Sequence, residues 1–216
     1  MKKRLVLNKD LIDDTFSELC KREKYEDYLV DKSYYKDPQG VGIYRLLAYI
    51  ADELVDLFGP CDKWDVGTNQ GTSAVILSSM FSGSGWVHTF DIVDNIRDDN
   101  IKYMMNRNRD IKIRIKNLLD DPEYLCDNLR KYNIPFIFLD IDPHLGEDER
   151  KFVEMLDKCG FSGILLLDDT RKDGLSSFWS ELMVRTDVKT YDVTKYGHWT
   201  GSGLVVFDKD LEVILE

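Results

Sequence analysis

The stretch WDVGTNQGTS, residues 64–73, has the residue types of a ligand-binding turn. An acid, Asp65, precedes two glycines at 67 and 71. Gly67 would let the chain turn sharply after a strand, and Gly71 would let a ligand approach the start of a helix closely. The glycine patterns of P-loop and dinucleotide sites do not occur here. Because an acid in this turn opposes a pyrophosphate, the turn suits a cationic group instead, an ammonium or a sulfonium.

A second acid, Asp91, ends the next apolar segment, in HTFDIVDN. It lies about 20 residues beyond the glycine turn, where an acid can accept hydrogen bonds from ribose hydroxyls. Taken alone, Asp91 could equally be a turn residue at the end of a strand. Combined with the glycine turn, it favours a ribose contact.

Acids also follow two strongly apolar segments, in FLDIDPHLGEDE and LLLDDTRKDG. Ligands of open α/β sheets bind at the carboxyl ends of the strands, so we expect Asp140, Asp168 and Asp169 to converge there. Asp168 and Asp169 can share a site only if the chain bends, because neighbouring strand residues point to opposite faces. Three clustered carboxylates favour partial protonation or a bound cation such as Mg²⁺, Mn²⁺ or Ca²⁺. Caps of turns or of the following helix are the alternative role.

Proton transfer at such a site would also need a general base, and three further residues are candidates. Asp142 and His144 follow Asp140, and His198 lies in KYGHWTGSG. A lone histidine is more often structural than catalytic, so both roles stay open for each imidazole. Trp199 could form a wall for a sugar or an aromatic ring, or could cover the sheet edge.

Positioning these residues requires alternating strands and helices. The patterns predict helices at 9–22, 42–58, 72–81, 97–108, 122–132, 147–158 and 176–184. They predict strands at 63–66, 86–93, 111–115, 136–141, 164–167, 188–193 and 203–207. Such alternation is typical of an α/β fold, a mostly parallel sheet with helices on both faces. The connection between the last two strands is too short for a crossover helix, so this pair should form an antiparallel hairpin.

Composition excludes several classes of protein. The chain has 216 residues, 43% of them hydrophobic, which suits one globular domain. Its net charge of −11 makes nucleic acid a poor partner. No apolar run reaches the ~20 residues of a membrane helix, and we expect a cytoplasmic protein with no membrane partner. The four cysteines form no CxxC pair, so we expect reduced thiols and no zinc site.

On these residues the chain resembles the class I S-adenosylmethionine-dependent methyltransferases. DVGTNQG after the first strand, Asp91 after the second, seven strands and the terminal hairpin carry the resemblance, over residues 42–208. The resemblance implies a Rossmann-like fold in which residues 42–216 bind the cofactor. Residues 1–41 would be an N-terminal helical cap at which substrate enters, within a single domain overall. The pattern D-x-G-T-x-x-G-x-S is similar to that of small O-methyltransferases of the catechol and macrolide-sugar type.

The same resemblance assigns residues to the cofactor and to a metal. The carboxylate near Gly67 would contact the methionine part of S-adenosylmethionine, Ser73 its carboxylate group, and Asn117 the adenine. The implied cofactor-binding residues are Asp65, Gly67, Thr68, Gly71, Ser73, Asp91, Asn117 and Asp140. In metal-dependent relatives three acids hold the ion, and they match Asp140, Asp168 and Asp169. DIDPH departs from the usual DGD or DH, which leaves the ligand set open.

We therefore expect an O-methyltransferase that uses S-adenosylmethionine and a divalent metal, Mg²⁺ or Mn²⁺. Its acceptor would be a hydroxyl of a small molecule or of a sugar or glycan, and a homodimer is left open. Four tyrosines could line the substrate mouth or pack on the next helix: Tyr25, Tyr28, Tyr34 and Tyr35. The alternatives are a hydroxylase-type or other metalloenzyme on the same scaffold, and a non-catalytic protein that binds S-adenosylmethionine. No 2-His-1-carboxylate spacing is visible for the former.

Overall fold

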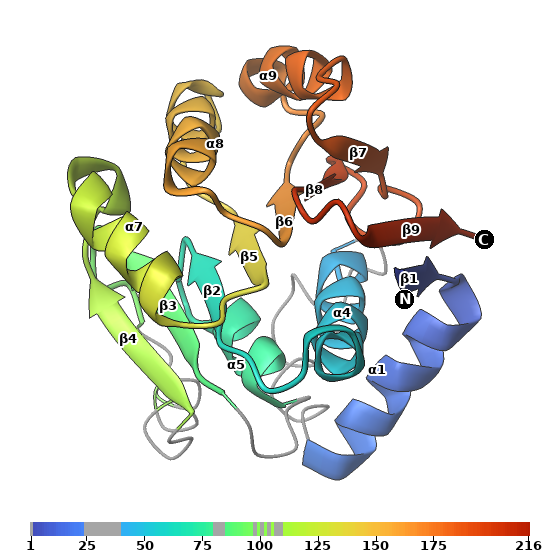
Figure 1. Cartoon of the computed structure of the whole chain (residues 1–216). Helices are drawn as coiled ribbons and strands as arrows, with labels where there is room; N and C mark the ends of the chain where they lie inside the picture. Colours follow the sequence, from blue (N-terminus) through green and yellow to red (C-terminus); the bar gives the residue numbers. More distant parts are fainter. Residues whose placement is uncertain are drawn as a thin grey trace.

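A seven-stranded sheet forms the centre of the structure (Figure 1). The structure is a computed structural model that describes residues 2–23, 40–79, 85–96, 99, 102, 105 and 110–216. The strands lie in the order β4-β3-β2-β5-β6-β8-β7. Their bounds are β2 (Lys63–Val66), β3 (Val87–Asp91), β4 (Ile111–Ile115), β5 (Phe136–Leu139), β6 (Ile164–Asp168), β7 (Lys189–Asp192) and β8 (Ser202–Val206). Only β8 runs against its neighbours within this sheet, which confirms the predicted parallel sheet with a final antiparallel hairpin.

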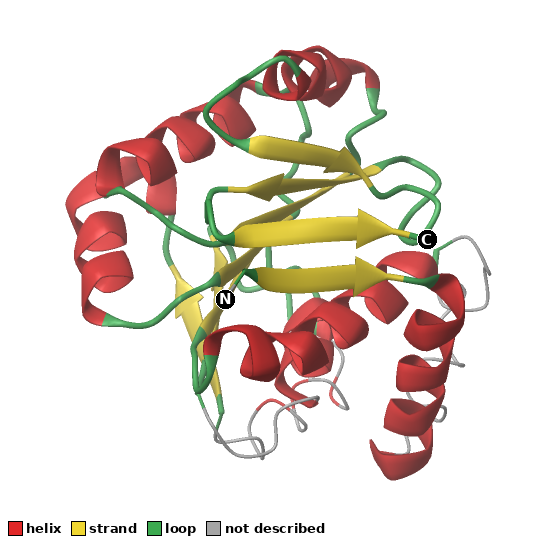
Figure 2. Ribbon diagram, turned by 45° about the vertical axis from the view of Figure 1, so that its right-hand side comes forward, coloured by secondary structure: helices red, strands yellow, loops and turns green. Residues whose placement is uncertain are grey.

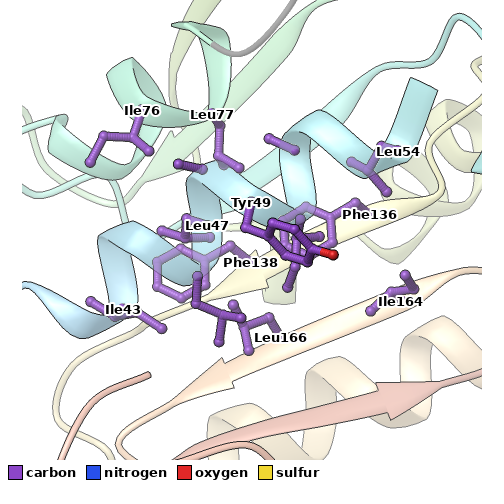
Figure 3. Packing of buried hydrophobic residues seen from close by; sticks show 14 of the residues in the cluster. Ile43, Leu47, Tyr49, Leu54, Ile76, Leu77, Phe136, Phe138, Ile164 and Leu166 are labelled. Atoms are coloured by element: carbon purple, nitrogen blue, oxygen red, sulfur yellow. The ribbon is translucent and has the colours of Figure 1, made fainter. Parts of the chain in front are cut away.

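Helices cover both faces of this sheet, as predicted. One face carries α4 (Gly42–Phe58) and α5 (Thr72–Ser79), and the other carries α7 (Pro122–Lys131), α8 (Glu147–Cys159) and α9 (Asp173–Met183). Successive strand residues enter opposite cores because they point to opposite faces. On β6, Ile164 and Leu166 join the core on the α4 side, and Leu165 and Leu167 join the other. Figure 3 shows the first of these cores, with side chains of α4 against those of β5 and β6.

Two further strands lie outside the main sheet, and the sequence patterns did not predict them. β1 (Lys3–Leu7) pairs in parallel with β9 (Leu211–Leu215), so the first and last strands of the chain lie side by side, with the N- and C-termini at opposite ends of the pair (Figure 2). Their inward side chains are fully buried, namely Leu5, Leu7 and Leu211. α1 (Lys9–Glu23) follows β1 and packs against α4. Alternating apolar residues in both segments were the available signal, but each is short and its partner lies about 200 residues away.

The predicted helix at 176–184 begins earlier in the structure, at Asp173. Asp173 and Gly174 are typical turn residues, which is why the pattern did not include them. At Gly174 a Cβ would lie 2.5 Å from the carbonyl oxygen of His144, so only glycine lets the start of α9 pack against this loop. The helix expected at 97–108 and the four tyrosines at 25–35 fall mostly or wholly outside the described residues. None of the described helices is long and apolar enough to span a membrane.

The expectation that all four cysteines are reduced thiols is wrong for two of them. Cys126 on α7 and Cys159 at the end of α8 form a disulfide, with their Cα atoms 4.9 Å apart. They are 33 residues apart in the sequence, and only the side-by-side packing of the two helices brings them together. Spacing along the chain therefore carried no signal of the pair. Cys20 and Cys61 are buried.

Reduction of this disulfide should lower the free energy of unfolding by about 3–4 kcal/mol, because closing a loop of this length restricts the unfolded chain. Urea unfolding with and without dithiothreitol measures the effect. The double variant Cys126→Ser, Cys159→Ser should match the reduced protein and not respond to the reductant. Equal stability of oxidised and reduced wild type would contradict the prediction.

Candidate functional site

The predicted site residues lie at one edge of the sheet. β3, β2, β5 and β6 are adjacent and parallel, so their carboxyl ends meet at the same edge. Gly67, Asp91, Asp140 and Asp169 lie directly at or after these four ends. Ligands of open α/β sheets bind at such an edge. The predicted site residues are therefore close together in the structure, at the edge where the sequence patterns placed them.

Gly67 turns the chain away from β2 with φ +104°. Its N–H donates to the carbonyl oxygen of Phe90 at 2.9 Å, and the N–H of Thr68 donates to the same oxygen at 3.1 Å. A Cβ at position 67 would lie 1.7 Å from the carbonyl oxygen of Asp140. No other residue fits here, because both the left-handed backbone and the contact exclude a side chain. Gly71, with φ +90°, makes the second turn before α5.

Asp91 is fixed by backbone groups on both sides of its carboxylate. One oxygen accepts the N–H of Asn69 at 2.8 Å, and the other accepts the N–H of Val93 at 3.1 Å. Carboxylate oxygens accept more than one hydrogen bond, so each retains capacity for a ligand hydroxyl. The glycine turn and the end of β3 are thus joined through this one side chain.

A cavity of about 240 Å³ opens between these strand ends. Apolar side chains line part of it, including Val66, Phe90, Ile92, Leu118, Ile141 and Phe152. Polar residues line the rest, including Asn69, Asp91, Lys116, Asn117, Asp140 and Asp142. Mixed linings with a few placed polar groups are typical of small-molecule sites. Four predicted cofactor-binding residues line the cavity: Gly67, Asp91, Asn117 and Asp140.

The other four predicted cofactor-binding residues do not line the cavity, namely Asp65, Thr68, Gly71 and Ser73. Thr68 and Ser73 are buried. Asp65 is fully buried on β2. Its Oδ2 accepts the Thr89 hydroxyl at 2.6 Å, whereas its Oδ1 has no hydrogen-bond partner of good geometry among the described residues. Burial raises the pKa of Asp65 to about 6. A buried acid with one unsatisfied oxygen is suited to a cationic or hydrogen-bond-donating ligand group.

The three acids expected to bind a metal do meet at this edge. Asp140 keeps 38% of its side-chain surface exposed and lines the cavity, while Asp168 and Asp169 are 5% exposed. Asp169 has φ +58°, and this bend lets the two consecutive aspartates share one site, as the sequence analysis required. Gly146 is the N-cap of α8, so neither Asp140 nor Asp142 caps this helix.

Their pKa values differ because their surroundings differ. Desolvation, together with the carboxylates of Asp169 and Asp65, raises the pKa of Asp140 to about 7. Burial, together with the carboxylates of Asp140 and Asp169, raises the pKa of Asp168 well above its usual value. Burial opposes ionisation of Asp169 too, but His198 and Lys172 outweigh it and hold its pKa well below the usual value. The cluster therefore contains two carboxyl groups that resist ionisation, Asp140 and Asp168, and one that ionises readily, Asp169.

Both candidate histidines face this acid cluster. His144 is 8% exposed, and its Nε2 lies 3.1 Å from Asp142 and 3.2 Å from Asp169. His198 is 5% exposed, and its Nδ1 lies 3.7 Å from Asp169 Oδ1 and hydrogen-bonds Thr200. His88 lies elsewhere, buried in β3 beside Asp62.

Within the described part of the chain, two groups bring ligand atoms within 4.8 Å of one another. The groups are Asp140–His144–Asp169 and Asp168–Asp169–His198. The predicted trio of aspartates is thus divided between them, and each group gains an imidazole. Two further contacts to the cluster were not predicted: Lys172 Nζ lies 2.5 Å from Asp169 Oδ2, and the Ser202 hydroxyl donates to Asp168 at 3.4 Å. Both lie within the stretches LLLDDTRKDG and KYGHWTGSG. Nothing in either stretch indicates which aspartate these side chains contact, so only the fold reveals them.

Known proteins with a similar structure were found, although none was found by sequence. The sequence matches no family model, and no curated protein matches it significantly. A methyltransferase of Podospora anserina with bound S-adenosylhomocysteine has a similar structure, with TM-score 0.59, 13% identity, and 95% of this chain and 98% of that one covered. An O-methyltransferase of Bacillus cereus, in complex with S-adenosylhomocysteine, gives TM-score 0.53 and 16% identity, covering 93% and 92%.

A third structure is similar to the same extent. It is an O-methyltransferase of Streptomyces achromogenes involved in tomaymycin synthesis, in complex with S-adenosylmethionine. It gives TM-score 0.53 and 14% identity and covers 94% of this chain and 92% of that one. At these identities the likeness concerns the fold. The chain shares the fold of these methyltransferase structures.

Proposed function

We propose that this protein is an S-adenosylmethionine-dependent O-methyltransferase that acts on a hydroxyl of a small molecule or sugar. One observation carries the proposal. Asp140 and Asp91 line the same cavity, and Asp140 also belongs to the cluster of acids and histidines beside it. A cofactor site and a polar acceptor site therefore share a boundary, as transfer between two bound molecules requires. The fold likeness to methyltransferases supports the same function.

The residues of the chain would hold the cofactor by complementary charge. Asp91, fixed by two backbone N–H groups, would accept hydrogen bonds from the ribose hydroxyls. Asp65 Oδ1 is buried without a hydrogen-bond partner of good geometry among the described residues, and the charged amino group of the methionine part would be a suitable partner for it. The bound cofactor would supply the electrophilic methyl group.

Asp140, Asp168 and Asp169 would hold a divalent metal, Mg²⁺ or Mn²⁺. Their oxygen donors suit such ions, and Asp169 Oδ1 is buried without a hydrogen-bond partner of good geometry among the described residues. When bound, the metal lowers the pKa of an acceptor hydroxyl and orients it. Cofactor and metal would thus relieve separate parts of the buried negative charge.

Among the predicted bases, the geometry favours Asp142 as proton acceptor. Its side chain is 90% exposed and lines the cavity, whereas His144 and His198 are buried against carboxylates. Two exposed apolar side chains follow these histidines in sequence, Leu145 at 62% and Trp199 at 60% exposure. The indole of Trp199 would offer a flat surface to a sugar or an aromatic acceptor, and Leu145 would offer an apolar contact.

Substituting Asp91→Ala should weaken binding of S-adenosylhomocysteine by about 10- to 100-fold, because hydrogen bonds to a charged group are lost. Isothermal titration calorimetry of the wild type and the variant measures this. Asp127→Ala removes an exposed carboxylate on α7, outside the cavity lining, and should leave affinity unchanged. No binding to the wild type would overturn the proposed function, and equal affinity of wild type and Asp91→Ala would overturn the ribose assignment.

Asp65→Asn should stabilise the ligand-free protein at neutral pH. The folded-state pKa of about 6 lies above the ordinary 3.8, so the folded protein binds this proton more tightly. Burying the carboxylate costs nothing below pH 4, and the cost grows to a limit on the order of 3 kcal/mol above pH 6. Urea unfolding at pH 4, 5, 6 and 7 measures the free energy of unfolding of both proteins. The value for the variant should exceed that for the wild type by an amount that grows across this range.

The same variant should bind S-adenosylhomocysteine more weakly at pH 7, because the charge opposite the amino group is lost. A stability difference that does not change with pH would contradict the assigned cost of burying Asp65. Unchanged affinity would contradict its contact with the cofactor.

A further inference from the structure

Asp169 presents each of its carboxylate oxygens to a different histidine. Oδ2 lies 3.2 Å from Nε2 of His144, and Oδ1 lies 3.7 Å from Nδ1 of His198. The side chain is 8% exposed, and its Oδ1 has no hydrogen-bond partner of good geometry among the described residues. A carboxylate that points one oxygen at each of two ligand groups has the arrangement of a bridge between two ions.

Each side of this carboxylate offers the same set of donors. Asp140 Oδ1 lies 3.9 Å from Nε2 of His144, and Asp168 Oδ2 lies 4.0 Å from Nδ1 of His198. Each group therefore contains one imidazole nitrogen and two carboxylates, all within 4.8 Å. Adjacent ligands of one ion lie about 3 Å apart when metal–ligand bonds are about 2.1 Å. Small side-chain movements would bring either group to that spacing.

The charge of the cluster also calls for more than one cation. Three carboxylates face one another here, two of them largely buried. Lys172 supplies one positive charge, with Nζ 2.5 Å from Asp169 Oδ2. Its side chain is 43% exposed, so it can swing into solvent when a cation takes its place.

We propose that this site binds two divalent transition-metal ions bridged by Asp169, one held with Asp140 and His144 and the other with Asp168 and His198. The inference rests on the proposed function for the role of the metal, and it extends the ligand set beyond the three aspartates. Imidazole ligands shift preference from Mg²⁺ towards Mn²⁺, Co²⁺ or Zn²⁺. Both histidines are then ligands, consistent with Asp142 as the proton acceptor.

Metal stoichiometry tests this inference directly. Metal-free full-length protein is titrated with Mn²⁺, and bound ions are counted by calorimetry and by elemental analysis after gel filtration. The wild type should bind two ions per chain, and His144→Ala and His198→Ala should each bind one. The electron paramagnetic resonance spectrum of the loaded wild type should show two spin-coupled Mn²⁺ ions, and each variant an isolated ion.

Lys172→Ala should tighten Mn²⁺ binding about fivefold, because the competing charge is removed. Lys158→Ala on the exposed surface of α8 is the matched control and should change nothing. Circular dichroism and thermal unfolding show whether each histidine variant is folded. One ion or none in the wild type, or two ions in both folded histidine variants, would overturn the inference.

Binding of S-adenosylhomocysteine to the metal-free protein separates this inference from the proposed function. Cofactor binding with a single Mn²⁺ would overturn the two-ion site and leave the methyltransferase proposal standing. Two Mn²⁺ ions without cofactor binding would support the two-ion site and overturn the methyltransferase proposal.

Discussion

The contact between Gly67 and the backbone of Asp140 is the constraint on which the whole site depends. A Cβ at position 67 would lie 1.7 Å from the Asp140 carbonyl oxygen, so the ends of β2 and β5 can be this close only because residue 67 has no side chain. The N–H of Asp140 also donates to the carbonyl oxygen of Val66 at 2.9 Å. These backbone contacts place Asp140 at the wall of the cavity. The acid cluster and the cofactor cavity consequently share one residue.

Buried negative charge is the second property that unifies the site. Burial raises the pKa values of Asp65, Asp140 and Asp168, so the ligand-free protein is destabilised by holding these groups ionised. A protein tolerates such a cost where a ligand relieves it. The amino group and sulfonium of the cofactor and the proposed metal ions are the cations that would do so. The same acids are thus unfavourable for stability and favourable for binding.

Much of the frame was predictable from sequence, because hydrophobic periodicity is a local property. FIFL and ILLL predicted central strands, and the short connection before β8 predicted the antiparallel hairpin. Asp168 and Asp169 were expected to share a site if the chain bent, and the positive φ of Asp169 provides that bend. The carboxyl ends of parallel strands lie at one edge of a sheet. The types of these residues and their places after the predicted strands were therefore sufficient to predict that they lie close together.

What was missed depends on contacts between distant segments. The β1–β9 pair joins the two ends of the chain, and the disulfide joins two helices that only the fold places side by side. The histidines were considered as bases, but their approach to Asp169 depends on the loops after β5 and before β8 meeting. No pattern within either loop predicts that the two loops lie close together. Tertiary geometry alone shows the two ligand groups.

A crystal structure of the protein grown with S-adenosylhomocysteine is the most direct test of the account. We predict electron density for the nucleoside in the cavity between the ends of β2, β3 and β5, with both ribose hydroxyls on Asp91 and the amino group directed at Asp65. The sulfur atom should lie on the side of Asp140. Density elsewhere on the protein, or an empty cavity at saturating ligand, would contradict the claim that this sheet edge binds the cofactor.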